Sequence, residues 1–218
     1  MTIVLKVGGA STGGVAEAVA ALHEPVCVVH GAGPQISDEM AKRGLEVLFV
    51  EGRRVTTPEV LEVVRESFAA VRSGICAAIG PAAVPLAGDE IGLEAEHVPE
   101  LGLVGTPVPS APEPIVRALA EGRIPVVAPL ATGPLNLNAD EAASALAVGL
   151  RAERILFVSD VPGLLLAGSL VGSIGADEAV ELLETGGLEG GILPKLRAAV
   201  LAARRGVPAE IGETAVLA

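Results

Sequence analysis

Aromatic residues and cysteines are nearly absent from this sequence of 218 residues. It has no tryptophan, no tyrosine and three phenylalanines, so a planar ligand would lie mostly between aliphatic side chains and backbone groups. The two cysteines, Cys27 and Cys76, lie in apolar or alanine-rich segments. That pattern is typical of buried free thiols in a reducing compartment, and we expect no disulfide framework.

Basic residues are also scarce: 15 lysines and arginines stand against 27 acidic residues, for a formal net charge of −12. A broad nucleic-acid interface needs clustered Lys and Arg, so nucleic acid is not an expected partner. No apolar run reaches the roughly eighteen residues of a transmembrane helix. Met1 leads straight into an apolar strand without a basic, cleavable leader. We therefore expect a cytoplasmic protein that does not bind membranes.

Hydrophobic residues make up 50% of the chain and form alternating strand-like and helix-like segments. Such alternation predicts an α/β fold with a doubly wound, mostly parallel sheet built from two lobes, about 1–133 and 134–218. The segment 81–110 is rich in Pro and Gly and predicts hairpins at a sheet edge or over a site. Strands are predicted at 2–7, 25–29, 124–128, 154–159, 208–211 and 214–217, and helices at 15–22, 35–43, 58–72, 112–121, 139–150, 176–185 and 193–205. T-T-P-E (56–59) marks the start of the third helix, either as a capping box or with Thr57 as N-cap and Pro58 at the first helical position.

Glycine-rich segments follow the first two predicted strands. K-V-G-G (6–9) ends the first strand, and H-G-A-G (30–33) ends the second strand and opens a helix. In α/β sheets ligands bind at the carboxyl ends of strands, and glycine lets the backbone approach an anion closely. Both loops are therefore candidates for phosphate binding, although each one alone is equally typical of an ordinary turn. We interpret His30 as a positioning residue and not as an acid or base.

Charged and amide side chains accompany these loops. G-R-R-V-T-T (52–57) supplies two arginines, whose planar guanidinium suits a small carboxylate, although either alone could be a surface residue. N-L-N-A-D-E (136–141) opens a helix and is either a functional cluster or an N-cap with dipole-favourable acids. G-G-I-L-P-K (190–195) places Lys195 in a first helical turn, and S-D-V-P-G-L (159–164) closes a strand. Neither G-x-x-x-x-G-K-[ST] nor G-x-G-x-x-G after the first strand occurs.

Taken in order, K-V-G-G, H-G-A-G, G-R-R-V-T, L-G-L-V-G, L-N-L-N-A-D-E-A-A, S-D-V-P-G-L and G-G-I-L-P-K resemble the amino acid kinase family from about residue 2 to 205. The resemblance is strongest to the branch that phosphorylates N-acetyl-L-glutamate in arginine biosynthesis. It implies an αβα sandwich around a mostly parallel sheet. It also implies an N-terminal lobe that binds the amino acid and dimerises, and a C-terminal lobe that binds ATP.

The same resemblance implies roles for individual residues. Lys6 and Lys195 would stabilise the transferring phosphoryl group, and Asp140 would hold both lysines in place. Arg54 and Asn136 would hold the carboxylate and acetamido ends of the substrate. Mg²⁺ would arrive on the ATP phosphates, with no dedicated protein ligands. Backbone N–H groups for the phosphate and the substrate would come from Gly8, Gly9, Gly31 and Ala32, and the nucleotide site would be lined by Ser159, Asp160, Gly163, Leu164, Leu165, Gly187, Leu188 and Glu189.

Three departures qualify the resemblance. Ala32 replaces a usual glycine, which would cost about 1 kcal/mol if its φ angle were positive. The segment after Pro208 is short, which thins the expected nucleotide wall. The sequence starts at its first strand, so we expect a homodimer that arginine does not inhibit, with the apolar helix 58–72 as a candidate interface. Two alternatives remain: a kinase for carrier-protein-bound aminoadipate or glutamate, and a non-catalytic ligand-binding homologue.

Overall fold

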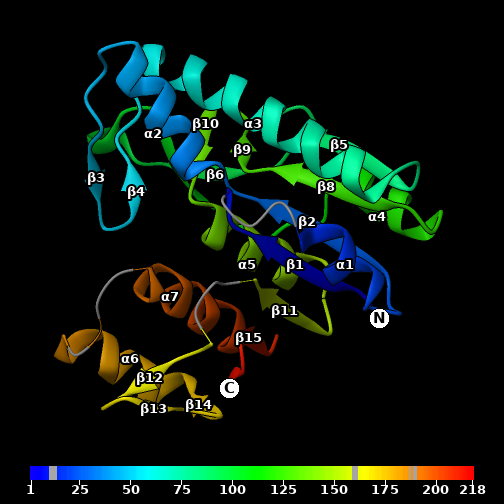
Figure 1. Ribbon diagram of the computed structural model, residues 1–218, viewed down its shortest axis with the longest axis vertical. Coiled ribbons are helices and arrows are strands. Elements are labelled where there is room, and N and C mark those ends of the chain that lie inside the picture. The colour runs from blue at the N-terminus through cyan, green and yellow to red at the C-terminus, as the bar shows by residue number, and fades with distance from the viewer. Residues whose placement is uncertain (10–13, 159–161, 187, 189–190) are drawn as a thin grey trace.

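The computed structural model describes residues 1–9, 14–158, 162–186, 188 and 191–218. The strands of its central sheet are β1 (Ile3–Val7), β2 (Val26–His30), β5 (Ala83–Ala87), β8 (Ile124–Ala128), β11 (Arg154–Phe157), β14 (Ser173–Gly175), β15 (Ala209–Ile211) and β16 (Thr214–Leu217). They run in the order β14-β16-β15-β11-β1-β2-β8-β5 (Figure 1). All neighbours are parallel except β15 and β16, so the predicted mostly parallel sheet is confirmed.

Helices cover both faces of this sheet because its strands alternate between two apolar cores. In β1, Val4 faces one core and Leu5 the other. The core with Leu5 packs against α1 (Val15–Ala20), α2 (Gly33–Lys42) and α3 (Pro58–Ile79). The core with Val4 packs against α4 (Glu113–Ala120), α5 (Ala139–Gly149), α6 (Ala176–Thr185) and α7 (Ile192–Ala203). The result is the expected αβα sandwich.

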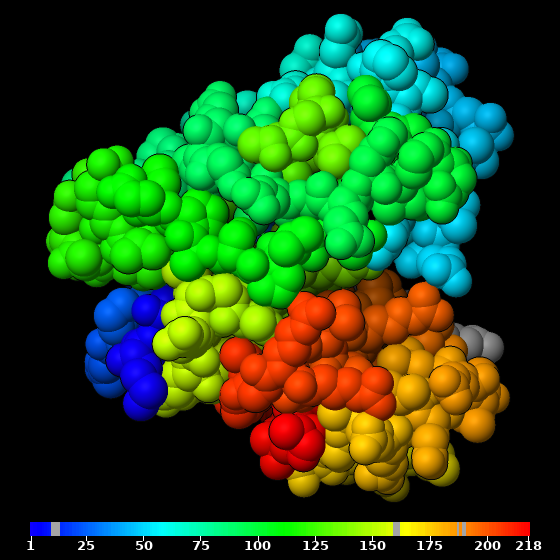
Figure 2. Space-filling model, turned by 180° about the vertical axis from the view of Figure 1, so that it is seen from behind, coloured from blue at the N-terminus to red at the C-terminus, as the bar shows by residue number. Residues whose placement is uncertain are grey.

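Segments far apart in the sequence lie side by side at the centre of the sheet. Strand β1 pairs with β2 on one side and with β11 on the other. Seen from behind, the N-terminal residues lie against the C-terminal half of the chain, below the segments that follow α3 (Figure 2). No helix among the described residues is both long and apolar enough to cross a membrane.

Shorter strands form three additional sheets. A four-stranded sheet has the order β6 (Ala95–His97), β7 (Val104–Pro107), β10 (Leu135–Leu137) and β9 (Leu130–Ala131), and a short 3₁₀ helix, η2 (Pro99–Leu101), precedes β7. Two hairpins stand apart: β3 (Phe49–Val50) with β4 (Arg53–Arg54), and β12 (Leu165–Leu166) with β13 (Ser169–Leu170).

The segment 81–110 differs in part from its prediction. Strands β6 and β7 are a hairpin, as expected, but β5 joins the main sheet as a parallel edge strand beside β8. Pro85 lies inside β5, and a proline without an N–H group is tolerated at an edge, where one side of the strand needs no partner. The proline-rich composition therefore concealed a regular strand.

Helix α3 is longer than predicted and faces inward. Its start follows the expected signals, because the Thr57 side chain accepts a hydrogen bond from the Val60 N–H group and Pro58 occupies the first turn. It continues to Ile79 and ends at Gly80, whose φ angle is 85°. The apolar positions that made this helix a candidate dimer interface are buried within the chain. What α3 leaves exposed is a face of small and acidic residues.

Candidate active site

A cavity of about 330 Å³ lies at the carboxyl ends of β1 and β2. Its walls come from the glycine loop after β1, the start of α2, the hairpin β3–β4, strand β10 with the start of α5, and Lys195 of α7. Three helices therefore direct their N-terminal ends toward one space, and each end carries a partial positive charge. The volume suits a small molecule, and the combined helix ends favour an anionic one.

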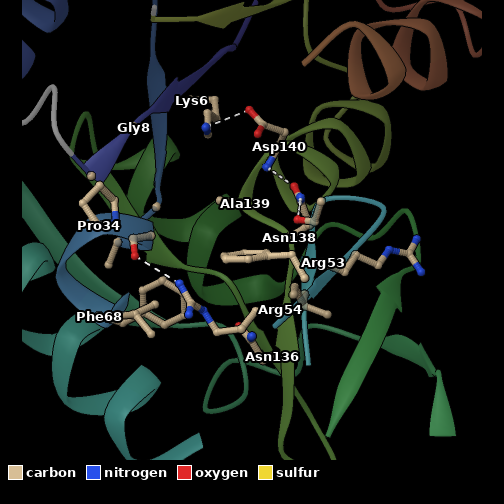
Figure 3. A pocket seen from close by; sticks show the side chains of 18 of the residues that line it. Lys6, Gly8, Pro34, Arg53, Arg54, Phe68, Asn136, Asn138, Ala139 and Asp140 are labelled. Carbon is tan, nitrogen blue, oxygen red and sulfur yellow. Dashed lines mark hydrogen bonds and ion pairs between the residues drawn. The ribbon is translucent and has the colours of Figure 1, made fainter. Parts of the chain in front are cut away.

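Lys6 and Asp140 form an ion pair inside this cavity, with 2.7 Å between the Lys6 Nζ atom and the Asp140 Oδ1 atom (Figure 3). Lys6 is the next-to-last residue of strand β1, and Asp140 lies in the first turn of α5. Their side chains are only 7% and 11% exposed. The carboxylate thus fixes the position of an ammonium group that would otherwise lose water without compensation.

Lys195 lines the same cavity from the first turn of α7, as the sequence predicted for its position. Its Nζ atom donates to the Gly191 carbonyl at 3.3 Å, and among the described residues it has no ion-pair partner. Asp140 therefore pairs with Lys6 and not with Lys195 in this structure, contrary to the expectation that it holds both. The ammonium group of Lys195 is left able to meet an anion in the cavity.

Arg54 is buried beside the cavity without a carboxylate partner among the described residues. Its Nη2 atom donates to the Gly33 carbonyl at 3.1 Å and to the Ser37 hydroxyl at 2.8 Å, and Nη1 lies 3.2 Å from the Met40 sulfur. Burial lowers the pKa of this guanidinium, which stays charged because the ordinary pKa of arginine is so high. A buried cation with only neutral partners favours an anion nearby.

Arg53, the neighbour of Arg54, points the other way (Figure 3). Its Nε and Nη2 atoms donate to the two carboxylate oxygens of Glu141 at 3.0 and 2.9 Å. The motif by itself did not separate the two arginines, and the family resemblance pointed to Arg54. The structure distinguishes the two, because Arg53 already has a carboxylate within the protein.

Asn136 and Asn138 have different environments. Asn136 is buried in β10, and its Nδ2 atom donates to the Thr56 hydroxyl at 3.0 Å, which in turn donates to the Arg54 carbonyl at 2.8 Å. Asn138 caps α5: its Oδ1 atom accepts from the N–H groups of Asp140 and Glu141. Both amides line the cavity. The N-cap interpretation therefore holds for Asn138, while Asn136 is held beside Arg54.

Gly8 and Gly9 line the cavity where they were predicted to lie. The Gly9 carbonyl accepts a hydrogen bond from the Gln35 Nε2 atom at 2.8 Å, which fixes the loop against α2. A Cβ atom on Gly9 would lie 2.5 Å from the Gln35 Oε1 atom and 2.9 Å from the Ala32 Cα atom. Only glycine fits there without displacing its neighbours.

The second loop differs from its prediction at Gly31. The Gly31 N–H group donates to the Val7 carbonyl at 2.9 Å, because the pairing of β1 and β2 continues past the strand end. It is therefore not available to a ligand. Ala32 has a φ angle of −148°, so alanine carries no left-handed strain there. Helix α2 has no side-chain cap, which leaves N–H groups of its first turn open to an anion.

His30 is fully buried at the end of β2, and its ring packs edge-on against Phe68 with 5.7 Å between centroids. Burial lowers its pKa to about 4. The imidazole is therefore neutral near pH 7, and it does not line the cavity. This placement agrees with a positioning role.

The predicted nucleotide residues are only partly described. Ser159, Asp160, Gly187 and Glu189 lie outside the described residues. Of the others, none lines the cavity. Leu164 and Leu188 belong to the core, and the Leu164 N–H group donates to the Thr214 hydroxyl at 2.8 Å. Gly163, at φ 151°, lies close to the Thr214 side chain, and Leu165 is half exposed on the hairpin β12–β13.

Phe49 is a cavity residue that the sequence did not indicate. It pairs with Arg54 across the hairpin, and its ring lies 4.6 Å from the Arg54 Cζ atom in a cation–π contact. The ring is 54% exposed. Its only signal in the sequence was its rarity, as one of three phenylalanines five residues before Arg54.

Known proteins resemble this chain along nearly its whole length. Acetylglutamate kinase of Rubrobacter xylanophilus is 41% identical over 96% of this chain and 88% of that protein. Acetylglutamate kinase of Salinispora tropica is 42% identical over 84% of this chain and 68% of that protein. The crystal structure of smu.665 from Streptococcus mutans shares the fold, with a TM-score of 0.90, 24% identity and coverage of 99% and 98% of the two chains.

The family profile agrees with the geometry of the site. Residues 1–213 match the description "amino acid kinase family", a span that includes Lys6, Arg54, Asp140 and Lys195. The resemblance inferred from the motifs is thereby confirmed, and the chain belongs to the amino acid kinase family.

Proposed function

We propose that this protein transfers the γ-phosphoryl group of ATP to the γ-carboxylate of N-acetyl-L-glutamate, a step of arginine biosynthesis. The observation that carries the proposal is a single cavity that holds Arg54, a buried cation that pairs with no carboxylate of the described residues, beside the Lys6–Asp140 pair. Relatives about 40% identical to this chain are named acetylglutamate kinases.

The chemistry needs alignment and positive charge more than proton transfer. A carboxylate oxygen of the substrate forms a bond to the γ-phosphorus as the bond to the β,γ-bridging oxygen breaks, and ADP leaves. The attacking carboxylate is already ionised near pH 7, so no general base is required. Lys6 and Lys195 meet the charge on the phosphoryl oxygens, while Arg54 binds the other carboxylate of the substrate.

Mg²⁺ is expected to enter on the phosphates of ATP. Within the described ranges, no three His, Cys, Asp or Glu side chains are grouped so that they could hold a metal ion. Asp140, which lines the cavity, is paired with Lys6, and its neighbour Glu141 is paired with Arg53. Bound Mg²⁺ would neutralise phosphate charge, and the residues of this chain would orient the substrates around it.

A hydroxamate assay tests the proposal. Hydroxylamine traps an acyl phosphate, and we expect a product that requires both ATP and N-acetyl-L-glutamate. Folded protein that gives no hydroxamate above the blank would refute the activity. A product formed only from a carrier-linked acid would show that the substrate is the carrier-bound one.

We also propose that the protein works in the cytoplasm as a homodimer, with the N-terminal part up to about residue 133 binding the amino acid and the rest binding ATP. Most soluble homo-oligomers are twofold dimers. Light scattering should give about twice the chain mass of 21.8 kDa. A mass equal to one chain at micromolar concentration would contradict the dimer.

A further inference from the structure

The ion pair between Arg53 and Glu141 lies at the edge of the cavity, where Arg53 is part of the lining, and it has no role in the chemistry proposed above. It is bidentate, with N–O distances of 3.0 and 2.9 Å, and the two side chains are only 23% and 17% exposed. A two-bond pair of this kind has a defined geometry, unlike most exposed pairs, which contribute little. It joins strand β4 of the hairpin to the first turn of α5.

Each partner is the sequence neighbour of a cavity residue. Arg53 precedes Arg54, and Glu141 follows Asp140. Side chains of adjacent residues in a strand point to opposite sides, so with the Arg53 guanidinium turned toward Glu141, the Arg54 guanidinium is turned toward α2 (Figure 3). The ion pair therefore fixes the distance between strand β4, which carries Arg54, and the first turn of α5, which carries Asp140.

A second contact ties the same hairpin to the same helix. The Asn138 Nδ2 atom donates to the Gly52 carbonyl at the hairpin tip, at 3.0 Å. Gly52 has a φ angle of 81°, and a Cβ atom there would lie 3.6 Å from the Pro194 Cβ atom, one residue before Lys195. The tip thus lies against the first turns of both α5 and α7.

The chain that leaves the hairpin is fixed at Thr56 by backbone hydrogen bonds with Leu101 and Leu103, but the hairpin itself is more exposed. It is a two-stranded sheet of its own, and Phe49 and Val50 are 54% and 47% exposed. The bonds of Arg54 to Gly33 and Ser37 attach it to α2, across the cavity from α5. The hairpin therefore bridges α2 and α5, and the Arg53–Glu141 pair is its charged attachment to α5.

We propose that Arg53 and Glu141 are a pair of positioning residues for the carboxylate-bearing substrate: their ion pair holds the hairpin β3–β4 against α5 and so sets where Arg54 meets that substrate relative to Lys6 and Asp140. This inference rests on the function proposed above. Small displacements of a binding group lower both affinity and rate, because the reacting atoms are no longer aligned.

A double-mutant cycle tests the pair. The variants Arg53→Gln, Glu141→Gln and the combination of both are compared with the wild type by steady-state kinetics and by calorimetric titration with N-acetyl-L-glutamate. Each single variant should raise the KM and the Kd for acetylglutamate at least fivefold, while the KM for ATP changes less than twofold. The combined variant should raise the KM and the Kd for acetylglutamate no more than the more strongly affected single variant does, because both changes remove the same interaction.

Controls separate positioning from general stability. Arg65→Gln breaks a comparable ion pair, between Arg65 of α3 and Asp89, that does not border the cavity, and it should leave both KM values unchanged. If Arg53→Gln does not fold, Arg53→Lys keeps the charge without the second bond and should give a smaller increase in the same KM. Melting temperatures are measured for all variants.

The outcomes distinguish the two proposals. Wild-type protein that neither binds acetylglutamate nor forms hydroxamate would overturn the proposed function and this inference with it. An active wild type whose single variants keep the KM for acetylglutamate within twofold would overturn the positioning role alone. The positioning role would also be overturned if the increase in KM of the combined variant equalled the product of the two single increases. The two residues would then act independently.

Discussion

At the scale of the residue, Arg54 and Arg53 show how neighbours of the same type acquire different tasks. Arg54 is buried against a carbonyl, a hydroxyl and a thioether, while Arg53 is neutralised by Glu141. A buried charge without a counter-charge is costly, and a bound carboxylate removes that cost. Since no carboxylate of the described residues pairs with Arg54, its neutral surroundings are the strongest indication of what the cavity binds.

Arg54→Lys should raise the KM for acetylglutamate at least tenfold and leave the KM for ATP nearly unchanged. Lysine keeps the positive charge but loses the planar group that binds both carboxylate oxygens. Steady-state kinetics with each substrate varied in turn measure the effect. Arg117→Lys, on the exposed face of α4, is the matched control. An unchanged KM would assign the substrate carboxylate to another group.

Lys6→Ala and Lys195→Ala should each lower kcat by about 10²- to 10³-fold, as the removal of comparable charge stabilisers does. The KM for acetylglutamate should change much less, because both ammonium groups are assigned to the phosphoryl group. Rapid hydroxamate assays at saturating ATP measure kcat. Lys42→Ala, on exposed α2, serves as the control. A Lys195 variant that raised only the KM for acetylglutamate would contradict its assignment.

The residue scale also shows where sequence reasoning ends. A phosphate-binding position for Lys6 and a carboxylate-binding arginine could be inferred from residue type and from position at strand ends, whereas the choice of Arg54 and the role of Asp140 came from the family resemblance. The pairing of Lys6 with Asp140 alone could not, because it depends on how α5 lies over β1. Likewise, two adjacent arginines in a strand must point opposite ways, but the pattern G-R-R-V-T does not say that Arg53 pairs with Glu141.

At the scale of the element, capping residues made the helices predictable. Thr57 caps α3 and Asn138 caps α5, both where the sequence indicated a start. The strand β5 was missed because Pro85 lies within it, and the hairpin β3–β4 because its strands have two residues each. Short or proline-containing strands are defined by their neighbours in the sheet, and a local pattern does not contain that information.

The loop after β1 is the element whose shape the cavity depends on most directly. Gly9→Ala should lower kcat/KM for ATP at least tenfold, because the added Cβ atom would overlap the Ala32 backbone and displace the loop. Initial rates at varied ATP concentration measure this. Gly14→Ala is the matched control, since a Cβ atom at Gly14 meets nothing within 4 Å, and it should have wild-type kinetics. Equal rates for both variants would show that the loop position is not critical.

At the scale of the whole molecule, buried His30 couples stability to pH. Its pKa falls from 6.5 to about 4 on burial, so between these values the unfolded chain binds more protons than the folded one. Stability from this group is complete above pH 6.5 and is lost as the pH falls toward 4, by up to roughly 3 kcal/mol.

His30→Leu should remove this dependence. Urea unfolding of the wild type and the variant at pH 7.5 and pH 4.5 gives the free energy of unfolding at each pH. Carboxylates that titrate in the same range contribute equally to both proteins, so their contribution cancels in the comparison. The wild type should lose more free energy of unfolding than the variant over this interval. Equal losses would show that His30 does not titrate differently in the two states.

The position of β1 between β2 and β11 has a consequence for synthesis on the ribosome. Strand β2 emerges soon after β1 and can cover one of its edges, but β11, which covers the other, begins only at Arg154. At about 5–20 residues per second, the nascent chain keeps that second edge uncovered for roughly 7–30 s. An uncovered apolar edge strand is a template for pairing with another chain. The strand that carries Lys6 is therefore the place where a slowly translated chain would first need protection by a chaperone.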